Sequence, residues 1–485
     1  MKFTIQPDPN KVAEYVGYLQ NCKSEAELTE LISANPHVTT YYVSLSPAFR
    51  LKTKNSLEHY NNSIYFVSKS ELLTRLSQDK KIPRWLQYEE NLKEIEAGSY
   101  RDIHPVTAEF ITTLHCNYRC EQCSYSEPKK MYNLWTDTNT NMFPGDVTIN
   151  DTHMSESTMI TAVDNLVKGG VRNILFTGGG EPFTNPKVTI NGMRYAKKNG
   201  LRVGLYTNGS LLNDKLVSDI LEISPLFIRI SIYGSNKETF SKYTNQEQEI
   251  FDRVITNLKL LASTKHSTSS DTILGLSFLV HPITMEKLET FPEIFATRFT
   301  KEERGAINFC RFTPSVDYFG GQQQSEAEIR SAFAIIEDII VPALNAYNIE
   351  AKPYYHRLND LHLCKQYHKC RASGWYAEVA PNADLYLCCE KLFLPSYKIG
   401  NLKEKSIKDI YRSQRRSSII GSVNRSCCKE CPPLCKPHEL NKLFYKIEEL
   451  KETRNLHLFT KWKNDLIGNG DEMSYFAGKL NDFES

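Results

Sequence analysis

Short runs of apolar and β-branched residues recur through the middle of the chain, and stretches with apolar residues at helical spacing separate them. Continuous apolar runs predict strands that are covered by helices, since such strands have no solvent face. Six strands are predicted, at residues 108–114, 173–178, 202–207, 227–233, 273–280 and 306–312. Residues 156–170 and 325–344 are typical of the amphipathic helices that accompany them.

The alternation of strand and helix indicates βα units around a parallel sheet. Six units are fewer than the eight of a complete barrel, so the expected fold class is α/β with an open, partial (β/α)6 barrel of TIM type. The active site of such a barrel lies at the carboxyl ends of its strands. Residues 124–152 form a long irregular segment after the first strand, and we expect them to lie over that end.

The regions on either side of the barrel lack this alternation. Helix-like patterns and short apolar runs before it indicate a mixed α/β region of unknown role, closed by an amphipathic helix at residues 80–98. The predicted domains are an N-terminal region at 1–104, the barrel at 105–349, an auxiliary domain at 350–437 and a helical C-terminal segment at 438–485.

Composition narrows the class of protein. With 59 basic and 57 acidic residues the chain has no electrostatic attraction for nucleic acid or an anionic membrane. No apolar stretch reaches the roughly 18 residues of a membrane span, and the first residues lack the pattern of a signal peptide. We therefore expect a cytoplasmic protein. In that reducing compartment, the 13 cysteines indicate metal ligands more than disulfides.

Three of the cysteines, Cys116, Cys120 and Cys123, directly follow the first predicted strand. Three thiolates leave a four-coordinate metal or an iron–sulfur cube one ligand short, and an open position on a metal is where chemistry takes place. The spacing alone leaves two interpretations open, which are an iron–sulfur cluster and a zinc ion completed by His115 or a distant ligand.

Small and polar residues follow the next three strands at the same edge of the sheet. They are Gly178, Gly179, Gly180, Glu181, Asn208 and Ser231. The glycines allow the backbone to approach a ligand closely, and the carboxylate suits the amino group of a zwitterion. Taken singly, Asn208 and Ser231 are better explained as a turn amide and a capped strand end than as ligand contacts.

In this order the residues resemble the radical S-adenosylmethionine (SAM) enzymes, over roughly residues 105–320. That family has a CxxxCxxC motif after the first strand, a GGE-type turn after the second and a serine on the fourth. The resemblance implies that the three cysteines hold a [4Fe-4S] cluster, whose fourth iron is chelated by the SAM amine and carboxylate. It also implies that Gly178 to Glu181, Asn208 and Ser231 contact SAM. Gln122 departs from the family pattern, in which this residue is commonly aromatic.

By the same resemblance, one electron from the cluster splits SAM into methionine and a 5′-deoxyadenosyl radical, which abstracts a hydrogen atom from the substrate. The electron would come from an external one-electron donor such as flavodoxin or ferredoxin. The residues do not indicate a catalytic side chain. Cys310, on the sixth predicted strand, is interpreted as a buried apolar residue, with hydrogen-atom return to a substrate radical as the alternative.

Eight further cysteines lie between residues 364 and 435 and resemble the SPASM and twitch extensions of the same superfamily. Those extensions bind auxiliary [4Fe-4S] clusters. The implied ligands of one cluster are Cys370, Cys388, Cys428 and Cys431, with Cys364 and Cys435 at additional positions. Alanine stands at position 383, where glycine is usual, and no cysteine follows Cys435.

At least one auxiliary cluster is therefore expected. A second one made with Cys389, Cys427 or Cys435 stays open, as does a zinc ribbon. Relatives with such extensions modify peptides or proteins, or act on small sugars and aminocyclitols. We favour maturation of a peptide or protein, because the N-terminal region and the segment 124–152 add surface for recognition. A non-catalytic metal scaffold and a cluster-based redox carrier are the remaining alternatives.

Overall fold

The computed structural model describes residues 104–123, 125, 152–315, 325–354 and 369–425, four short N-terminal strands and scattered residues between 357 and 452. The chain divides into two compact units, one made of residues 1–103 and 439–485 and the other of residues 104–438. The predicted helices at residues 80–98 and after residue 438, and most of the segment 124–152, lie outside the described residues.

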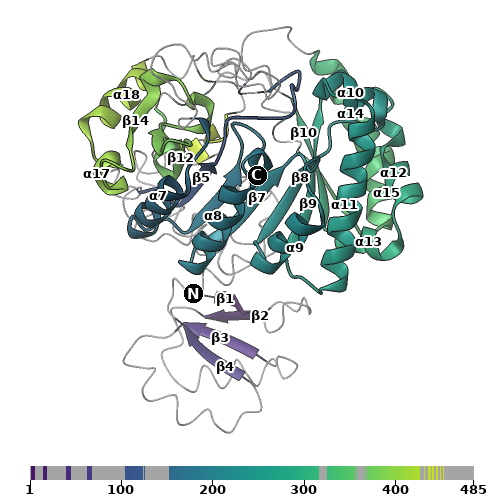
Figure 1. The fold of residues 1–485 in the computed structure, drawn as a ribbon, viewed down its shortest axis with the longest axis horizontal. Helices are drawn as coiled ribbons and strands as arrows, with labels where there is room; N and C mark the ends of the chain where they lie inside the picture. Colours follow the sequence, from purple (N-terminus) through teal and green to yellow (C-terminus); the bar gives the residue numbers. More distant parts are fainter. Residues whose placement is uncertain are drawn as a thin grey trace. The chain divides into compact units, whose positions relative to one another are not determined.

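In the first unit the described strands form two small sheets (Figure 1). One pairs β1 (Lys2–Ile5) with β2 (Tyr15–Tyr18) in antiparallel fashion. The other pairs β3 (Thr40–Ser44) with β4 (Ser63–Val67) in parallel. A parallel pair needs a crossover connection, so this unit has more than a simple hairpin at its centre.

The second unit is built on one sheet of ten strands, in the order β11-β10-β9-β8-β7-β6-β5-β12-β13-β14. The strands are β5 (Thr107–Ile111), β6 (Asn173–Thr177), β7 (Arg202–Thr207), β8 (Phe227–Ser231), β9 (Ile273–Val280), β10 (Phe309–Pro314), β11 (Glu350–Pro353), β12 (Tyr376–Val379), β13 (Asp384–Tyr386) and β14 (Lys398–Asn401). All neighbours from β11 to β12 are parallel, and β13 and β14 are antiparallel additions. The largely parallel sheet confirms the predicted fold class.

The six predicted strands are all present, as β5 to β10, with different ends. The first ends at Ile111 and the fourth at Ser231, both earlier than predicted. The sixth begins at Phe309, because the residues before it form the helix α13 (Lys301–Ala306). The strand β11 was not predicted, since its sequence EAKP has no apolar run. The sheet also continues through β12 into the region that resembles a SPASM extension.

Helices cover the outer face of this sheet (Figure 1). The α-helices are α7 (Glu156–Lys168), α8 (Pro186–Lys198), α9 (Asp214–Ile223), α10 (Lys237–Thr244), α11 (Glu249–Ser267), α12 (Phe291–Arg298), α13, α14 (Glu326–Ile335), α15 (Val341–Ala346), α17 (Ile407–Tyr411) and α18 (Gln414–Arg425). The shorter turns are η2 (Pro182–Thr184), η3 (Leu288–Thr290), the π-helix η4 (Ile336–Ile340), η5 (Ala372–Trp375), η6 (Cys389–Lys391) and η7 (Pro395–Tyr397). None of the helices in the described part of the chain has the length and apolarity needed to cross a membrane.

Local sequence accounts for where these helices begin and break. The Ser155 side chain accepts a hydrogen bond from the Thr158 amide at the start of α7, and Asn213 caps α9 in the same way. The helix predicted at residues 325–344 is interrupted by the π-helix η4. Pro342 follows it and has no amide hydrogen to donate, which explains the change of helical register there.

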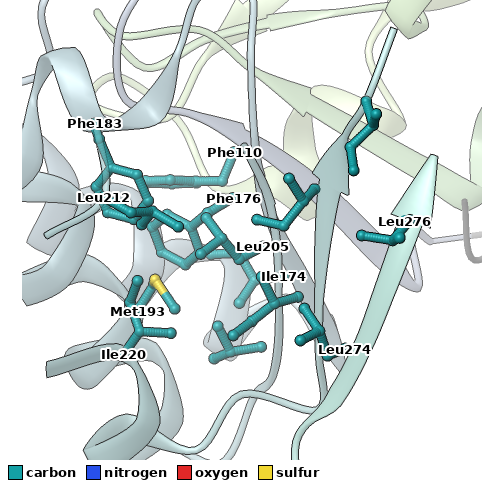
Figure 2. Close-up of a cluster of buried hydrophobic side chains, with 14 of the residues drawn as sticks. Phe110, Ile174, Phe176, Phe183, Met193, Leu205, Leu212, Ile220, Leu274 and Leu276 are labelled. Atoms are coloured by element: carbon teal, nitrogen blue, oxygen red, sulfur yellow. The ribbon is translucent and has the colours of Figure 1, made fainter. Parts of the chain in front are cut away.

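The main core lies between the sheet and these helices. Figure 2 shows Phe110, Phe176 and Leu205, from three adjacent strands, packed together with Met193 of α8 and Ile220 of α9. All five side chains are fully buried, and burying each one contributes about 1.5–3 kcal/mol. Because side chains alternate along a strand, the residues between these core positions extend from the opposite, inner face of the sheet.

The alternation of side chains along β10 argues against one interpretation of Cys310, the return of a hydrogen atom to a substrate radical. This thiol belongs to the same helix-facing core as its strand neighbour Phe312, and it has 0% exposure. Burial raises the pKa of the Cys310 thiol. The residue is therefore a small buried apolar side chain, and it does not face the interior of the barrel, where a hydrogen-atom donor to a substrate radical would have to lie.

Candidate active site

The three thiols of the first cluster motif are brought together in the loop that follows β5. None of Cys116, Cys120 and Cys123 is in a disulfide, and all three are half-buried. Tyr118, between the first two, is buried, and its pKa is raised by burial and also by the nearby Cys120 and Cys116. Several soft donors in one loop, without a disulfide, fit an iron–sulfur cluster that leaves one iron open.

The thiol loop is anchored to the end of helix α10. The backbone amide of Arg119 donates to the Thr244 carbonyl (3.1 Å), and the Asn245 side chain donates to the Arg119 carbonyl (2.8 Å). The Tyr118 ring meets Phe240 of the same helix edge-on, with 5.9 Å between ring centroids. The thiols are thus held over the carboxyl ends of the strands, where a barrel places its active site.

The glycine turn after β6 interlocks with this loop. The amide of Gly180 donates to the Thr113 carbonyl (3.1 Å), and that of Glu181 donates to the His115 carbonyl (2.8 Å). A β-carbon on Gly180 would lie 1.9 Å from the His115 oxygen. Only glycine fits this close approach of two backbones. The turn therefore fixes the position of His115, the residue before the first cluster cysteine, Cys116.

Glu181 is 3% exposed and holds the turn against β7. Its carboxylate accepts hydrogen bonds from the amide of Phe183 (3.2 Å), the Thr207 hydroxyl (2.6 Å) and the amide of Asn208 (2.7 Å). Three donors favour the charged form of a buried carboxylate. An anion is thereby maintained beside the thiol loop, as the suggested contact with an amino group requires.

Asn208 belongs to a network that the sequence did not indicate. Its side-chain amide donates to the Asn117 side-chain oxygen (2.9 Å), and Asn117 donates to the Ser210 hydroxyl (2.8 Å). Ser210 in turn donates to the Asn208 side chain (2.8 Å). Asn117 lies inside the thiol motif, so this network ties the cluster loop to the end of β7. The motif's spacing could have suggested a role for Asn117, but its partners come from contacts distant in sequence.

Ser231 ends β8 and is half-buried. Ser231 forms a side-chain hydrogen bond with Tyr233. This bond lowers the Tyr233 pKa, whereas burial has a larger effect and raises it. Cys120 also raises the Tyr233 pKa. Ser231 is therefore near the thiol loop, in the region where the resemblance predicts the SAM ribose.

Two histidines are held by structural contacts. The His115 ring stacks on His153 with 4.2 Å between centroids, and its Nε2 lies 3.2 Å from the Thr152 hydroxyl. His281 is buried, its Nδ1 accepts a hydrogen bond from the Ile283 amide (3.1 Å), and burial lowers its pKa to about 4. A neutral, internally bonded His281 is unsuited to hold a proton for catalysis near pH 7.

A second group of thiols lies in the region that resembles a SPASM extension. Cys370, Cys431 and Cys435 lie close enough to Cys388 to raise the pKa of its thiol, after the larger effects of burial and of Glu390. Four thiols from different parts of the chain, none of them in a disulfide, are therefore neighbours. Bringing so many potential anions into a buried site is unfavourable unless a metal centre neutralises them. The donor set fits an auxiliary cluster. Cys364, Cys427 and Cys428 lie outside the described residues.

Cys389 shares Glu390 and Cys435 as neighbours with Cys388, and it also lies beside Glu378. It offers a ligand atom within 4.8 Å of those of Glu109 and Glu378, two residues that pair across β5 and β12. Glu109 forms an ion pair with Lys436. Cys389 also lies near the auxiliary thiols, because Cys388 and Cys435 raise its pKa in addition to burial, Glu390 and Glu378.

A small apolar cluster connects the two thiol groups. Phe393 packs against Tyr125 and Tyr386, with ring centroids 6.1 and 5.9 Å apart. Its ring would also touch a β-carbon on Gly179, at 2.7 Å.

Ala383 stands in the turn between β12 and β13 with φ +69°. This left-handed conformation, which costs an alanine about 1–2 kcal/mol, explains why glycine is usual there.

Replacement of Cys388 by alanine should remove about four iron atoms per chain while the SAM-binding cluster stays in place. Cys388 is buried among the auxiliary thiols and has no contact with Cys116, Cys120 or Cys123 among the interactions described. Anaerobic iron and sulfide analysis measures the loss, and Cys389→Ala is the adjacent control if one auxiliary cluster is present. Equal iron in Cys388→Ala and the unaltered protein would contradict the ligand assignment.

Comparison with known families agrees with this geometry. The profile of the radical SAM superfamily matches residues 110–289, and that of the SPASM iron–sulfur cluster-binding domain matches residues 370–432. The chain therefore belongs to the radical SAM superfamily, has a C-terminal SPASM domain and is a radical SAM enzyme. Its cofactors are SAM on a [4Fe-4S] cluster and one or more auxiliary iron–sulfur clusters in the SPASM domain.

Curated relatives are distant. A dTDP-4-amino-4,6-dideoxy-D-glucose ammonia-lyase of Streptomyces venezuelae is 26% identical over 207 residues, 41% of this chain and 41% of that protein. A tungsten-containing aldehyde ferredoxin oxidoreductase cofactor-modifying protein of Pyrococcus furiosus is 23% identical over 322 residues, 62% of this chain and 80% of that protein. The chain thus spans less than half the length of the first of these relatives.

Among solved structures, that of Streptococcus suis SuiB is similar with a TM-score of 0.50 and 12% identity. The likeness covers 90% of this chain and 95% of that chain. At such low identity it shows the fold alone. It confirms the partial barrel followed by a SPASM region.

Proposed function

We propose that this radical SAM enzyme acts on a peptide or protein, from which it abstracts a hydrogen atom during maturation. One observation carries the proposal. All residues assigned to SAM and to the clusters belong to the unit of residues 104–438, so the separate unit of residues 1–103 and 439–485 is available for recognising a large substrate. SuiB, which has a similar fold, has been solved bound to its precursor peptide SuiA.

In this proposal the described residues hold and orient the cofactors. The thiols Cys116, Cys120 and Cys123 bind the SAM-binding cluster, and Glu181 with the backbone of Gly178 to Gly180 lies against the methionyl part of SAM. Asn208 and Ser231 contact the remainder of SAM. When bound, the cluster and SAM supply a 5′-deoxyadenosyl radical. An external one-electron donor such as flavodoxin or ferredoxin reduces the cluster.

The proposed ligands of the auxiliary cluster are Cys370, Cys388, Cys428 and Cys431, with Cys435 at an additional position, and Phe393, five residues after Cys388, contacts Tyr125, two residues after Cys123. This cluster could accept an electron from the substrate radical or bind the substrate directly. Tyr125 is influenced by groups on both sides, because Cys389 and Cys123 both raise its pKa in addition to burial. The position of Tyr125 between Cys389, next to the proposed ligand Cys388, and Cys123 supports electron transfer between the two sites in an oxidative outcome.

The test is product analysis with the full-length, anaerobically reconstituted protein. Peptides encoded by short reading frames beside its gene are incubated with SAM and a reductant, and sugar nucleotides and aminocyclitols form a parallel series. We expect a peptide to increase 5′-deoxyadenosine formation and to change in mass. Stimulation by a sugar nucleotide or aminocyclitol alone would contradict peptide maturation.

A second candidate is action on a small sugar or aminocyclitol. It is favoured by the Streptomyces venezuelae relative, which is named for a nucleotide-linked sugar substrate. In that case the same substrate series would give 5′-deoxyadenosine with the sugar nucleotide and no mass change in any peptide.

A further inference from the structure

Two arginines extend from the inner face of the barrel. Arg229 stands between Ile228 and Ile230, which are both buried in the helix-facing core. Arg311 likewise stands on β10 between two residues of that core. Because adjacent residues of a strand point to opposite faces, both guanidinium groups lie on the side away from the helices. Charged residues within buried parallel strands are uncommon and need a partner.

The strand register brings the two arginines near one another. Arg229 pairs with Tyr206 on one side and with Gly275 on the other, and its guanidinium carbon lies 3.5 Å from the centroid of the Tyr206 ring. Arg311 pairs with Ser277 on the same strand, β9. Of the two small residues of β9 between the arginines, Gly275 is covered by the ring of Phe309 from β10, and Ser277 carries only a short hydroxyl side chain.

The two guanidinium groups interact unfavourably. Burial lowers the pKa of Arg229 to about 10, and the charge of Arg311 contributes to that shift. Three tyrosines raise the Arg229 pKa and so oppose this shift, namely Tyr206, Tyr354 and Tyr233. No carboxylate is among the groups that act on Arg229. Within the described part of the chain, the contact recorded for Arg229 is the Tyr206 ring, and it makes no hydrogen bond or ion pair. A stacked guanidinium still has five N–H donors around its edge.

The arginine pair lies close to the SAM site. Tyr233 is influenced by Cys120 of the thiol loop and also by Arg229 and Arg311. Ser231 and Arg311 are both in register with Ser277, so they stand at the same height in the barrel. A group held by the arginines would therefore lie inside the barrel between the level of Ser231 and that of Arg229, two residues earlier on β8.

We propose that Arg229 and Arg311 form an oxyanion-binding subsite that holds a carboxylate or phosphate group of the substrate inside the barrel. The inference depends on the proposed function only in assigning that group to the substrate. In a peptide it would be an acidic side chain or a terminal carboxylate, and in a sugar nucleotide a phosphate. Bidentate, charge-assisted hydrogen bonds from arginine would orient the substrate for hydrogen abstraction.

Calorimetric titration of the full-length, reconstituted protein tests the subsite without any turnover. The probes are sodium pyrophosphate, N-acetylglutamic acid amide and the neutral N-acetylglutamine amide, at constant ionic strength and with saturating SAM. We expect at least one anionic probe to bind and the neutral one not to bind. Tighter binding of the glutamate probe supports a carboxylate source, and tighter binding of pyrophosphate supports a phosphate source.

Substitution identifies the residue responsible. Arg229→Gln should weaken binding of the anionic probe about tenfold or more, the usual effect of losing a charged hydrogen-bond partner. Arg229→Lys, which keeps the charge, should lose less. Arg194→Gln is the matched control, because Arg194 is exposed on α8 and pairs with Asp219. Iron content and the circular dichroism spectrum report whether each variant is folded.

Three results would overturn the inference. They are no binding of either anion by the unaltered protein, equal binding by Arg229→Gln and Arg194→Gln, and a loss of SAM affinity in Arg229→Gln that matches the loss for the probe. The last result would assign Arg229 to the SAM carboxylate. These titrations involve no substrate peptide. The arginine subsite and peptide maturation are therefore tested separately, and a negative result for one does not decide the other.

Discussion

Replacing Cys120 with alanine is expected to abolish 5′-deoxyadenosine formation from SAM and to remove about four iron atoms per chain. Cys120 lies in the loop held by Thr244 and is one of three thiols available to the SAM-binding cluster. Two remaining thiolates cannot hold a cube while its fourth iron stays open for SAM. The measurement is chromatography of the nucleoside product after anaerobic reduction, together with iron and sulfide analysis.

Cys310→Ala is the matched control for this variant. Its thiol is fully buried in the helix-facing core and belongs to neither cysteine motif. We expect it to lower the free energy of unfolding by about 1 kcal/mol and to leave iron content and product formation unchanged. If Cys120→Ala formed as much 5′-deoxyadenosine as the control, the assignment of the SAM-binding cluster would be wrong.

Gly180→Ala is expected to have an effect nearly as large, although no ligand atom is removed. The new β-carbon would lie 1.9 Å from the His115 oxygen and 2.5 Å from its carbonyl carbon. These are backbone atoms next to Cys116, so the thiol loop would have to move. We expect the SAM-binding cluster to be lost or depleted, the auxiliary cluster to be retained, and stability to fall by about 1–3 kcal/mol, as for other overpacked sites.

Gly305→Ala provides the control for adding a methyl group. A β-carbon there would meet nothing within 4 Å, and the residue lies in helix α13. Alanine is favoured over glycine in a helix by up to about 1 kcal/mol, so this variant should be slightly more stable and should bind iron normally. Normal iron content and SAM cleavage in Gly180→Ala would show that the turn and the thiol loop are less closely coupled than the contacts indicate.

Much of the barrel could be predicted from the sequence, because its strands are continuous apolar runs and its motifs follow those runs directly. The position of Cys116, Cys120 and Cys123 after β5 is a local feature of the chain. Their contact with the glycine turn is not local, and it depends on backbone hydrogen bonds such as that from Glu181 to His115. The hydrogen-bonding network of Asn117 was missed for the same reason.

Features that depend on pairing between distant segments could not be predicted. The strand β12 joins the sheet beside β5, and Cys388 has Cys370, Cys431 and Cys435 as neighbours from other parts of the C-terminal region. The face on which Cys310 lies depends on strand register, since a shift of one residue exchanges the two faces. Arg229 did carry a signal in the sequence, because it is a charged residue within an apolar strand.

The central claim is that the cluster on the thiol loop has an open iron that binds SAM. The most direct measurement is the electron paramagnetic resonance spectrum of the reduced Cys388→Ala protein, recorded with and without SAM, since this variant should keep the SAM-binding cluster and lack the auxiliary one. We predict a reduced [4Fe-4S] signal that changes when SAM is added. A cluster signal that SAM leaves unchanged, or no iron–sulfur signal at all, would contradict the account.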